Sequence, residues 1–181
     1  IGSVVVVADG FAEKDEEGAR MQRELVEAAK RSGVRVIGPN TAGIVNSLNG
    51  LNPCPYDAGY YRFKKGPVSI CSQTGMINPQ AYAYPDLGFG VSKICDLGNK
   101  CDVDECDLLE YFENDDSTGV ISIYLESISD GKRFLEIARR VSKKKPVLAL
   151  KVGTTKAGAK ASASHTGSLA VDDAVFGAAC N

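Results

Sequence analysis

The hydrophobic positions of this chain fall into short, β-branched runs separated by segments with a helical repeat. The first run, Val4–Ala8, is continuously apolar, which is the pattern of a strand covered on both faces. From Glu16 to Arg31, apolar residues recur at helical spacing with charged residues between them, and Gly33 follows as a C-terminal cap. A second run, Val34–Ile37, completes a β-α-β unit, which favours a parallel sheet.

The same alternation continues more regularly after residue 66. The pattern predicts strands over Pro67–Cys71, Val91–Cys95, Gly119–Leu125 and Pro146–Lys151. It predicts helices over Ile77–Tyr84, Val103–Phe112 and Gly131–Val141, and the start of another over Asp172–Ala179. Four strand–helix pairs in about 115 residues indicate an α/β fold class with a flavodoxin-like, doubly wound parallel sheet.

Between these two regions the alternation is lost. Residues 47–65 are rich in Asn, Pro, Gly and Tyr and show no sustained period, so we expect a linker there. The linker separates residues 1–46 from residues 66–181, which carry the regular alternation. Because the first segment starts directly with a strand, we expect the chain to begin inside a domain.

Composition and charge exclude several classes of function. Of the 181 residues, 44% are hydrophobic and 24% are charged, as in an ordinary globular protein. A net charge of −2 offers no basic surface for nucleic acid or anionic lipid. The sequence contains no apolar run of the roughly 20 residues that span a membrane, and its start lacks the basic residues of a signal peptide.

Metal-binding and several catalytic motifs are also missing from the sequence. The six cysteines include no Cys-x-x-Cys pair, and the single histidine cannot complete a Cys/His zinc site at the usual spacings. We therefore expect reduced thiols in a cytosolic core, with Cys71 in a strand and facing the core. The acidic run over residues 102–107 lacks the glycine and final glutamate of a calcium loop and is expected to begin a helix. No Gly-x-Ser-x-Gly or Walker A pattern is present.

Polar residues follow four of the expected strands, Pro146–Lys151 among them, and ligands of open parallel sheets collect at such strand ends. The turn Ser72–Gly75 leads into a helix, so its free N–H groups suit phosphate, although the same residues also cap helices for structural reasons. Glu126 follows an apolar strand and is either a solvated or capping carboxylate, or the acceptor of an imidazole N–H. The segment Gly38–Gly43 forms a rigid turn that is able to border a cofactor but is unspecific by itself.

The loop over residues 153–168 contains the single histidine, His165, among Gly, Ala, Ser, Thr and Lys. Such a segment cannot anchor itself by apolar burial, and loops of this length are often functional. One interpretation is an incidental, exposed histidine. The other is a reactive imidazole flanked by hydroxyl and N–H donors that are able to hold a phosphate.

Six segments, taken in order, carry a resemblance to a known family: GFAE (10–13), GPNTAG (38–43), SQTG (72–75), LGNKCDVDECDLLEY (97–111), YLES (124–127) and SHTG (164–167). Together they resemble the NDP-forming acyl-CoA synthetases, which include the ADP-forming acetyl-CoA synthetases and, more distantly, the α subunit of succinyl-CoA synthetase. The resemblance covers essentially the whole chain. The long block and SHTG are specific in combination, whereas each segment alone is not.

The resemblance implies a role for each candidate residue. His165 corresponds to the histidine that becomes transiently phosphorylated, and Glu126 to the glutamate that stabilises the phosphohistidine. The residues that hold phosphate would be Ser72, Thr74, Gly75, Ser164, Thr166 and Gly167. The residues that border the cofactor CoA would be Gly38, Pro39 and Asn40.

The resemblance also implies domains and a reaction. Residues 1–46 would be the C-terminal part of a Rossmann-like CoA-binding domain, and residues 66–181 a flavodoxin-fold ligase domain. Phosphate would convert an acyl-CoA into an acyl phosphate, and His165 would take the phosphoryl group and pass it to ADP. An ATP-grasp subunit or fused domain, outside this chain, would bind ATP or ADP with Mg²⁺. The chain alone is therefore expected to be inactive.

The expected protein acts on a small carboxylic acid in the cytoplasm, as part of a homo- or hetero-oligomer. Thr41, Met76–Asn78 and Val171 depart from the family pattern; they remove no proposed catalytic group but leave the acyl group open. Two other readings remain. One is a non-catalytic domain that senses acyl-CoA or a metabolite, and the other is an enzyme similar to ATP-citrate lyase.

Overall fold

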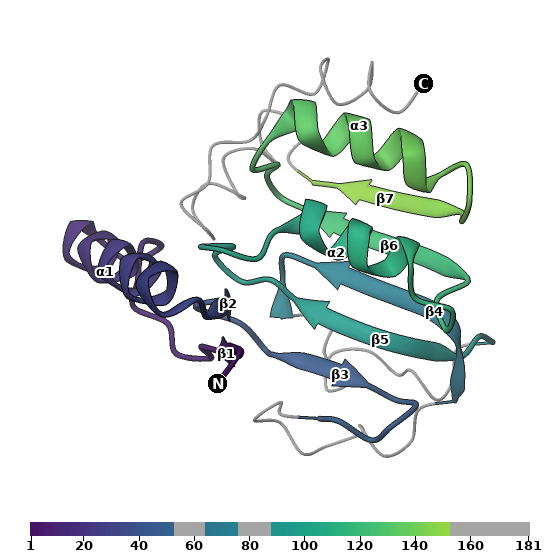
Figure 1. The fold of residues 1–181 in the computed structure, drawn as a ribbon, viewed down its shortest axis with the longest axis horizontal. Helices are drawn as coiled ribbons and strands as arrows, with labels where there is room; N and C mark the ends of the chain where they lie inside the picture. Colours follow the sequence, from purple (N-terminus) through teal and green to yellow (C-terminus); the bar gives the residue numbers. More distant parts are fainter. Residues whose placement is uncertain (53–63, 76–87, 153–181) are drawn as a thin grey trace.

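A computed structural model describes residues 1–52, 64–75 and 88–152, which form two sheets (Figure 1). The larger sheet has five strands in the order β3-β5-β4-β6-β7. These strands are β3 (Ile44–Asn46), β4 (Lys65–Ser72), β5 (Val91–Asp96), β6 (Val120–Leu125) and β7 (Val147–Lys151). The last four are mutually parallel, whereas β3 runs antiparallel to β5. The predicted α/β fold is confirmed, with a sheet that is mostly rather than entirely parallel.

The smaller sheet pairs β1 (Ser3–Val5) in parallel with β2 (Arg35–Ile37), and α1 (Glu16–Ser32) connects the two strands. Asp15 caps the start of α1 by accepting the Gly18 N–H at 2.8 Å. Gly33 ends the helix with a φ of 63°, the left-handed conformation that glycine adopts without strain. The predicted β-α-β unit and its glycine cap are therefore confirmed.

One face of the larger sheet is covered by α2 (Glu105–Glu113) and α3 (Gly131–Val141) (Figure 1). Apolar side chains from both helices pack onto the sheet and form the core, including Leu109, Phe112, Phe134, Ile137, Ile121, Ile123 and Leu125. Each side chain of this size contributes about 1.5–3 kcal/mol when it is fully buried. The core thus fixes the two helices against β6, whose carboxyl end carries Glu126.

The acidic run at residues 102–107 forms the start of α2, as the sequence predicts. The Asp104 side chain accepts the N–H groups of Cys106 and Asp107, at 2.9 and 3.0 Å. The Asp107 side chain accepts the Asp104 N–H in return, at 3.3 Å. This reciprocal capping box satisfies N–H groups that the first helical turn leaves unpaired.

The hydrophobic pattern did not predict β3. This strand has only three residues, which is too short for an alternation to be recognised, and its conformation comes from pairing Ile44 with Cys95 of β5. It lies within residues 1–46 but belongs to the larger sheet. β1 ends at Val5 rather than Ala8, because β2 offers it only three partners. The division of the chain into domains stays a prediction, and the helices expected over Ile77–Tyr84 and Asp172–Ala179 lie outside the described residues.

The cysteines that the structure describes are free thiols, three of them buried: Cys71, Cys95 and Cys106. Cys71 faces the core, as predicted, and burial raises the pKa of Cys106 to about 12. Within the described ranges, no group of three or more His, Cys, Asp or Glu side chains is placed to hold a metal ion. None of the helices in these ranges is long and apolar enough to cross a membrane.

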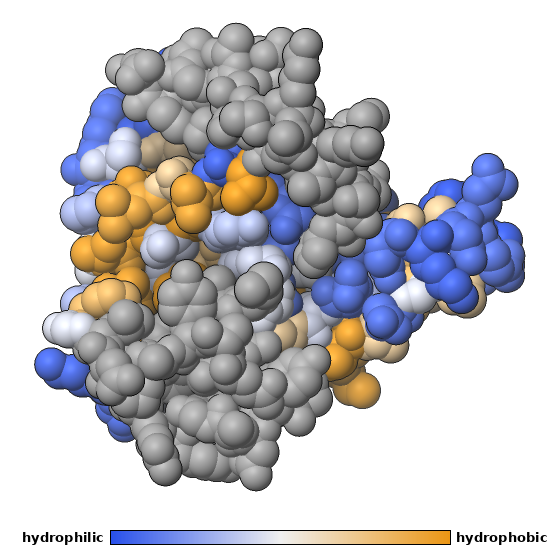
Figure 2. All heavy atoms as spheres, turned by 180° about the vertical axis from the view of Figure 1, so that it is seen from behind, coloured by the Kyte–Doolittle hydropathy of each residue, from blue (hydrophilic) through white to orange (hydrophobic). Residues whose placement is uncertain are grey.

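The face of the sheet opposite α2 and α3 also carries hydrophobic surface (Figure 2). On β7, Leu148 and Leu150 are 63% and 61% exposed. They alternate with Val147, which packs against the core on the side of α3, so they point to the opposite face. Apolar side chains on both faces are typical of a doubly wound sheet.

A largely buried ion pair joins β5 to the loop between α2 and β6. Lys93 Nζ lies 2.6 Å from Asp115 Oδ2 and 2.5 Å from Ser117 Oγ. Burial raises the pKa of Asp115, but hydrogen bonds from Lys93, Thr118 and Ser117 outweigh burial and lower the pKa to about 2. A lowered pKa means that Asp115 stabilises the fold above the unfolded-state pKa of about 3.9, and that this contribution is lost as the pH falls towards 2.

We expect Asp115→Asn to lower the free energy of unfolding at pH 7 by about 2 kcal/mol, because the amide removes the charge that stabilises buried Lys93. The difference from the unchanged chain should shrink between about pH 5 and pH 2, where Asp115 itself takes up a proton. Urea unfolding of both proteins over this range measures the difference. A difference independent of pH would contradict the assignment.

Candidate active site at the carboxyl edge of the sheet

The ends of β4, β5 and β6 lie side by side at the carboxyl edge of the larger sheet. Ser72 of β4 is paired with Asp96 of β5 on one side and with Tyr124 of β6 on the other. Beyond the strands, the Leu97 N–H donates to Ser72 O at 2.7 Å, and the Gln73 N–H donates to Tyr124 O at 3.1 Å. The register therefore brings the turn after β4, the turn after β5 and the loop after β6 into one site.

Glu126 is held at this edge by the side chain of Gln73. Gln73 Oε1 accepts the N–H groups of Glu126 and Ser127, both at 2.9 Å, and Gln73 Nε2 donates to Ser127 Oγ at 2.8 Å. Glu126 is only 4% exposed, so its carboxylate is buried rather than solvated. Of the two interpretations that the sequence left open, a solvated carboxylate is thus wrong. No role was predicted for Gln73 itself, although an amide directly after a strand is a recognisable signal.

The turn over Ser72–Gly75 forms more internal hydrogen bonds than expected from the sequence. The Thr74 N–H donates to Ser72 Oγ, and the Ser72 hydroxyl donates to Thr74 O, both at 3.1 Å. Because the Gln73 N–H is also bonded, two of the N–H groups expected to be free for an anion already have acceptors. Gly75 lies close to the neighbouring segment: a Cβ on it would be 3.4 Å from Ala42 Cβ and 3.6 Å from Asp96 Oδ2.

Asp96 is a second buried carboxylate at this edge, and it is not among the residues predicted from the sequence. Its Oδ2 accepts the Ala42 N–H at 2.6 Å and its Oδ1 accepts the Gly98 N–H at 3.2 Å. Burial raises the pKa of Asp96; these hydrogen bonds oppose that effect, and the charge of Glu126 adds to it. Asp96 follows an apolar strand just as Glu126 does, so the same sequence signal would have found it.

The turn Leu97–Lys100 packs against the turn Gly38–Asn40. The Asn99 N–H donates to Pro39 O at 2.9 Å and the Cys101 N–H donates to Gly38 O at 3.1 Å. Gly38 and Pro39 are buried in this contact, whereas Asn40 is half-buried. Of the three residues predicted to border a cofactor, Asn40 therefore has the most accessible side chain.

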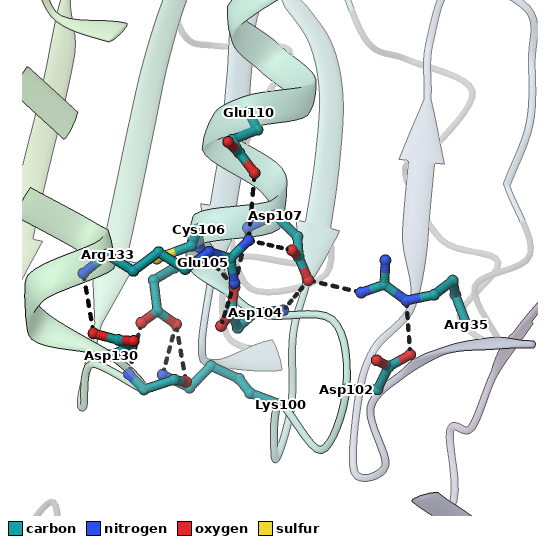
Figure 3. A network of polar contacts seen from close by, with 11 residues as sticks. Arg35, Lys100, Asp102, Asp104, Glu105, Cys106, Asp107, Glu110, Asp130 and Arg133 are labelled. Atoms are coloured by element: carbon teal, nitrogen blue, oxygen red, sulfur yellow. Dashed lines mark hydrogen bonds and ion pairs between the residues drawn. The ribbon is translucent and has the colours of Figure 1, made fainter. Parts of the chain in front are cut away.

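A network of charged side chains fixes the β1-α1-β2 unit against the larger sheet (Figure 3). Asp107 of α2 stands at its centre and accepts from Arg35 of β2 at 2.8 Å and from Arg133 of α3 at 2.6 Å. Asp102 extends the network by accepting Arg35 Nε at 3.0 Å and the Val36 N–H at 2.7 Å. These bonds join elements from both sheets through one helix terminus.

The structure thus brings together one part of the predicted site. Ser72, Thr74, Gly75 and Glu126 meet at one edge, and Asn40 reaches the same region through the turn Leu97–Lys100. The other predicted residues, Ser164, His165, Thr166 and Gly167, lie outside the described residues. Their roles, and those of the phosphate-binding turn, stay predictions.

Comparison with known proteins places the chain in a family. The family described as succinyl-CoA ligase like flavodoxin domain matches residues 65–181. The chain belongs to this family.

Its relatives include ADP-forming ligases. The chain is 42% identical over 179 residues to the α subunit of acetate–CoA ligase (ADP-forming) I of Pyrococcus furiosus, covering 97% of this chain and 38% of the relative. It is 44% identical over 181 residues to acetate–CoA ligase (ADP-forming) of Methanocaldococcus jannaschii, covering 98% of this chain and 24% of the relative. The chain therefore spans about a quarter to two fifths of the length of these relatives.

A solved structure shares the fold as well. The dinucleotide forming acetyl-coenzyme A synthetase 1 of Candidatus Korarchaeum cryptofilum, in complex with phosphate and ADP, superposes with a TM-score of 0.86 at 39% identity. The match covers 98% of this chain and 38% of that chain. The resemblance to the α subunits of ADP-forming acetyl-CoA synthetases is thereby confirmed for the family and the fold.

We expect Gly98→Ala to destabilise the chain by about 3 kcal/mol or more, because the new Cβ would lie 2.2 Å from Pro39 O and 2.5 Å from Asn40 O. Gly33→Ala is the matched control. Gly33 also has a positive φ but no atom within 4 Å of the new Cβ, so only the left-handed backbone costs about 1–2 kcal/mol. Chemical denaturation of both variants measures the costs. Equal costs would mean that the two turns separate without penalty.

Proposed function

We propose that the chain belongs to an NDP-forming acyl-CoA synthetase and carries the histidine, His165, that is transiently phosphorylated. The observation that carries this proposal is the buried Glu126, which Gln73 fixes at the carboxyl edge beside the turn Ser72–Gly75. A carboxylate in this position suits an imidazole as a partner, because it accepts one ring N–H and stabilises the positive charge of the ring. The similarity to ADP-forming acetate–CoA ligases supports the same chemistry.

The proposed reaction has three balanced steps. Phosphate attacks the thioester carbonyl of an acyl-CoA, and the thiolate of CoA leaves to give an acyl phosphate. The neutral His165 imidazole then attacks phosphorus, and the carboxylate of the product acid leaves. Finally, an ADP oxygen attacks the phosphohistidine, and the neutral imidazole is regenerated as ATP forms.

Each group of the chain has a defined task in this scheme. Glu126 would orient the imidazole and offset its charge while phosphorus is bonded. Ser72, Thr74 and Gly75, with the Ser164–Gly167 segment, would hold the phosphoryl oxygens. Asn40 would contact CoA, with Gly38 and Pro39 shaping its turn. The nucleotide would bind with Mg²⁺, which neutralises phosphate charge, on an ATP-grasp subunit or fused domain.

The expected setting follows from these substrates. Acyl-CoA, ADP and ATP are cytoplasmic metabolites, so we place the enzyme in the cytoplasm. Because the proposed nucleotide-binding part lies outside this chain, catalysis requires a partner subunit or a longer chain, and we expect an oligomer. The substrate acid would be small.

We expect the full-length protein to incorporate acid-labile, base-stable label from γ-labelled ATP, in the presence of its nucleotide-binding part. Replacing His165→Ala should abolish the label on the segment 1–181, because His165 is the single histidine of that segment. Labelled protein separated by denaturing gel electrophoresis, with and without acid treatment, measures this. Label that persists on this chain in the variant would refute the proposed phosphohistidine.

We expect Glu126→Gln to slow the phosphorylation of His165 by about tenfold or more, because the amide keeps the shape but removes the charge that stabilises the imidazolium. Glu110→Gln on α2 is a matched control, since that carboxylate is half-exposed and pairs with Arg133 and Arg140 of α3. Rapid-quench labelling measures both rates. Equal rates for Glu126→Gln and the unchanged protein would remove Glu126 from the mechanism.

A further inference from the structure

A buried ion pair, in addition to Gln73, holds the loop that carries Glu126. Lys100 Nζ lies 2.9 Å from Glu105 Oε2, and the two side chains are only 4% and 0% exposed (Figure 3). Each partner also bonds the backbone of the loop: Lys100 Nζ donates to Ser127 O at 2.8 Å, and Glu105 Oε1 accepts the Ser129 N–H at 2.7 Å. The pair is thus hydrogen-bonded to the backbone of Ser127 and Ser129, on either side of Ile128.

Stability alone gives a weak reason for such a pair. Removing two charges from water is costly, and well-packed apolar residues often stabilise a fold as well or better in the same place. Charged groups instead form strongly directional hydrogen bonds, because each bond to the loop requires one orientation of the ammonium or carboxylate. The pair therefore defines where the backbone after Glu126 runs.

The position of Lys100 is itself set by the neighbouring turn. Lys100 has a φ of 54°, a left-handed conformation that is costly for a residue with a side chain. The turn is held in place by the bond from the Asn99 N–H to Pro39 O and by the bond from the Lys100 N–H to Leu97 O at 3.1 Å. The Lys100 side chain thus extends from a fixed backbone position to the Glu126 loop, where its Nζ bonds Ser127 O.

We propose that Lys100 and Glu105 are positioning residues, which hold the Glu126 loop in the one conformation that presents the carboxylate to the phosphorylated histidine. This inference rests on the role of Glu126 in the proposed function. Gln73 fixes the first residues of the loop and the ion pair fixes the following ones, so the loop is held on both sides. In this proposal both residues act on the Glu126 loop and not on the reacting atoms.

The experiment uses the full-length protein with its nucleotide-binding part. Lys100→Met/Glu105→Gln removes both charges together, so no unpaired charge is left buried. The matched control is Lys93→Met/Asp115→Asn, which neutralises the ion pair between β5 and the loop after α2. Glu126→Gln and the triple variant Lys100→Met/Glu105→Gln/Glu126→Gln complete a mutant cycle. Phosphorylation rate at saturating ATP, the KM for ATP and the unfolding midpoint are measured for each.

We expect Lys100→Met/Glu105→Gln to slow phosphorylation by about tenfold with an unchanged KM for ATP, and the control to react near the unchanged rate. The triple variant should be no slower than Glu126→Gln, because the pair acts through Glu126. The inference is overturned if the pair variant reacts at the unchanged rate, if the control is equally slow, or if the triple variant shows the product of both losses. If Glu126→Gln itself reacts at the unchanged rate, the proposed role of Glu126 fails, and this inference fails with it.

A second variant tests the same contact if the double substitution prevents folding. Ser129→Pro removes the N–H that Glu105 accepts and leaves both charges paired. It should slow phosphorylation, whereas Ser129→Ala keeps that N–H and should react faster than the proline variant. Equal rates for these two variants would overturn the inference.

Discussion

Because β4, β5 and β6 pair in parallel and in one register, Ser72, Asp96 and Tyr124 stand at the same level of the sheet. The chain segments that leave these strands are therefore within reach of one another, and their backbone N–H groups need acceptors where strand pairing stops. Gln73 supplies the acceptor for the loop after β6, and Asp96 supplies it for Ala42 and Gly98. The edge of the sheet is thus built from side chains that satisfy backbone groups of another segment.

This edge concentrates buried negative charge. Asp96 and Glu126 both lie in the interior, and burial, with the charge of Glu126, raises the pKa of Asp96. Such surroundings favour an N–H donor or a cation over an anion. They suit the imidazole that the proposed reaction requires. Since the N–H groups of Gln73 and Thr74 are already bonded, the proposed phosphate-binding turn would need further donors for the phosphoryl oxygens, from Gly75 and from the segment around His165.

The charged network at the start of α2 has a different task. Its bonds between Arg35, Asp107 and Arg133 involve partly exposed side chains, and such pairs contribute little to stability one by one. Their effect is to fix the relative positions of these elements, because the single carboxylate of Asp107 on α2 binds both Arg35 of β2 and Arg133 of α3. The turn over residues 97–100 lies directly beside it and carries contacts from the turn Gly38–Asn40 to the Glu126 loop.

The sequence by itself determined most of the helices and strands. It also located the ends of β4 and β6, where Ser72–Gly75 and Glu126 lie. Hydrophobic periodicity reports burial along one segment, so it placed α3 at Gly131–Val141 and located Glu126 at the end of an apolar strand. It could not predict β3, whose three residues become a strand only by pairing with β5. Nor could it give Gln73 or Lys100 a role, because their partners lie 53 and 27 residues away in the chain. Only the tertiary structure decided which groups hold Glu126, since hydrogen bonds between distant segments depend on the register of the sheet and leave no period in the sequence.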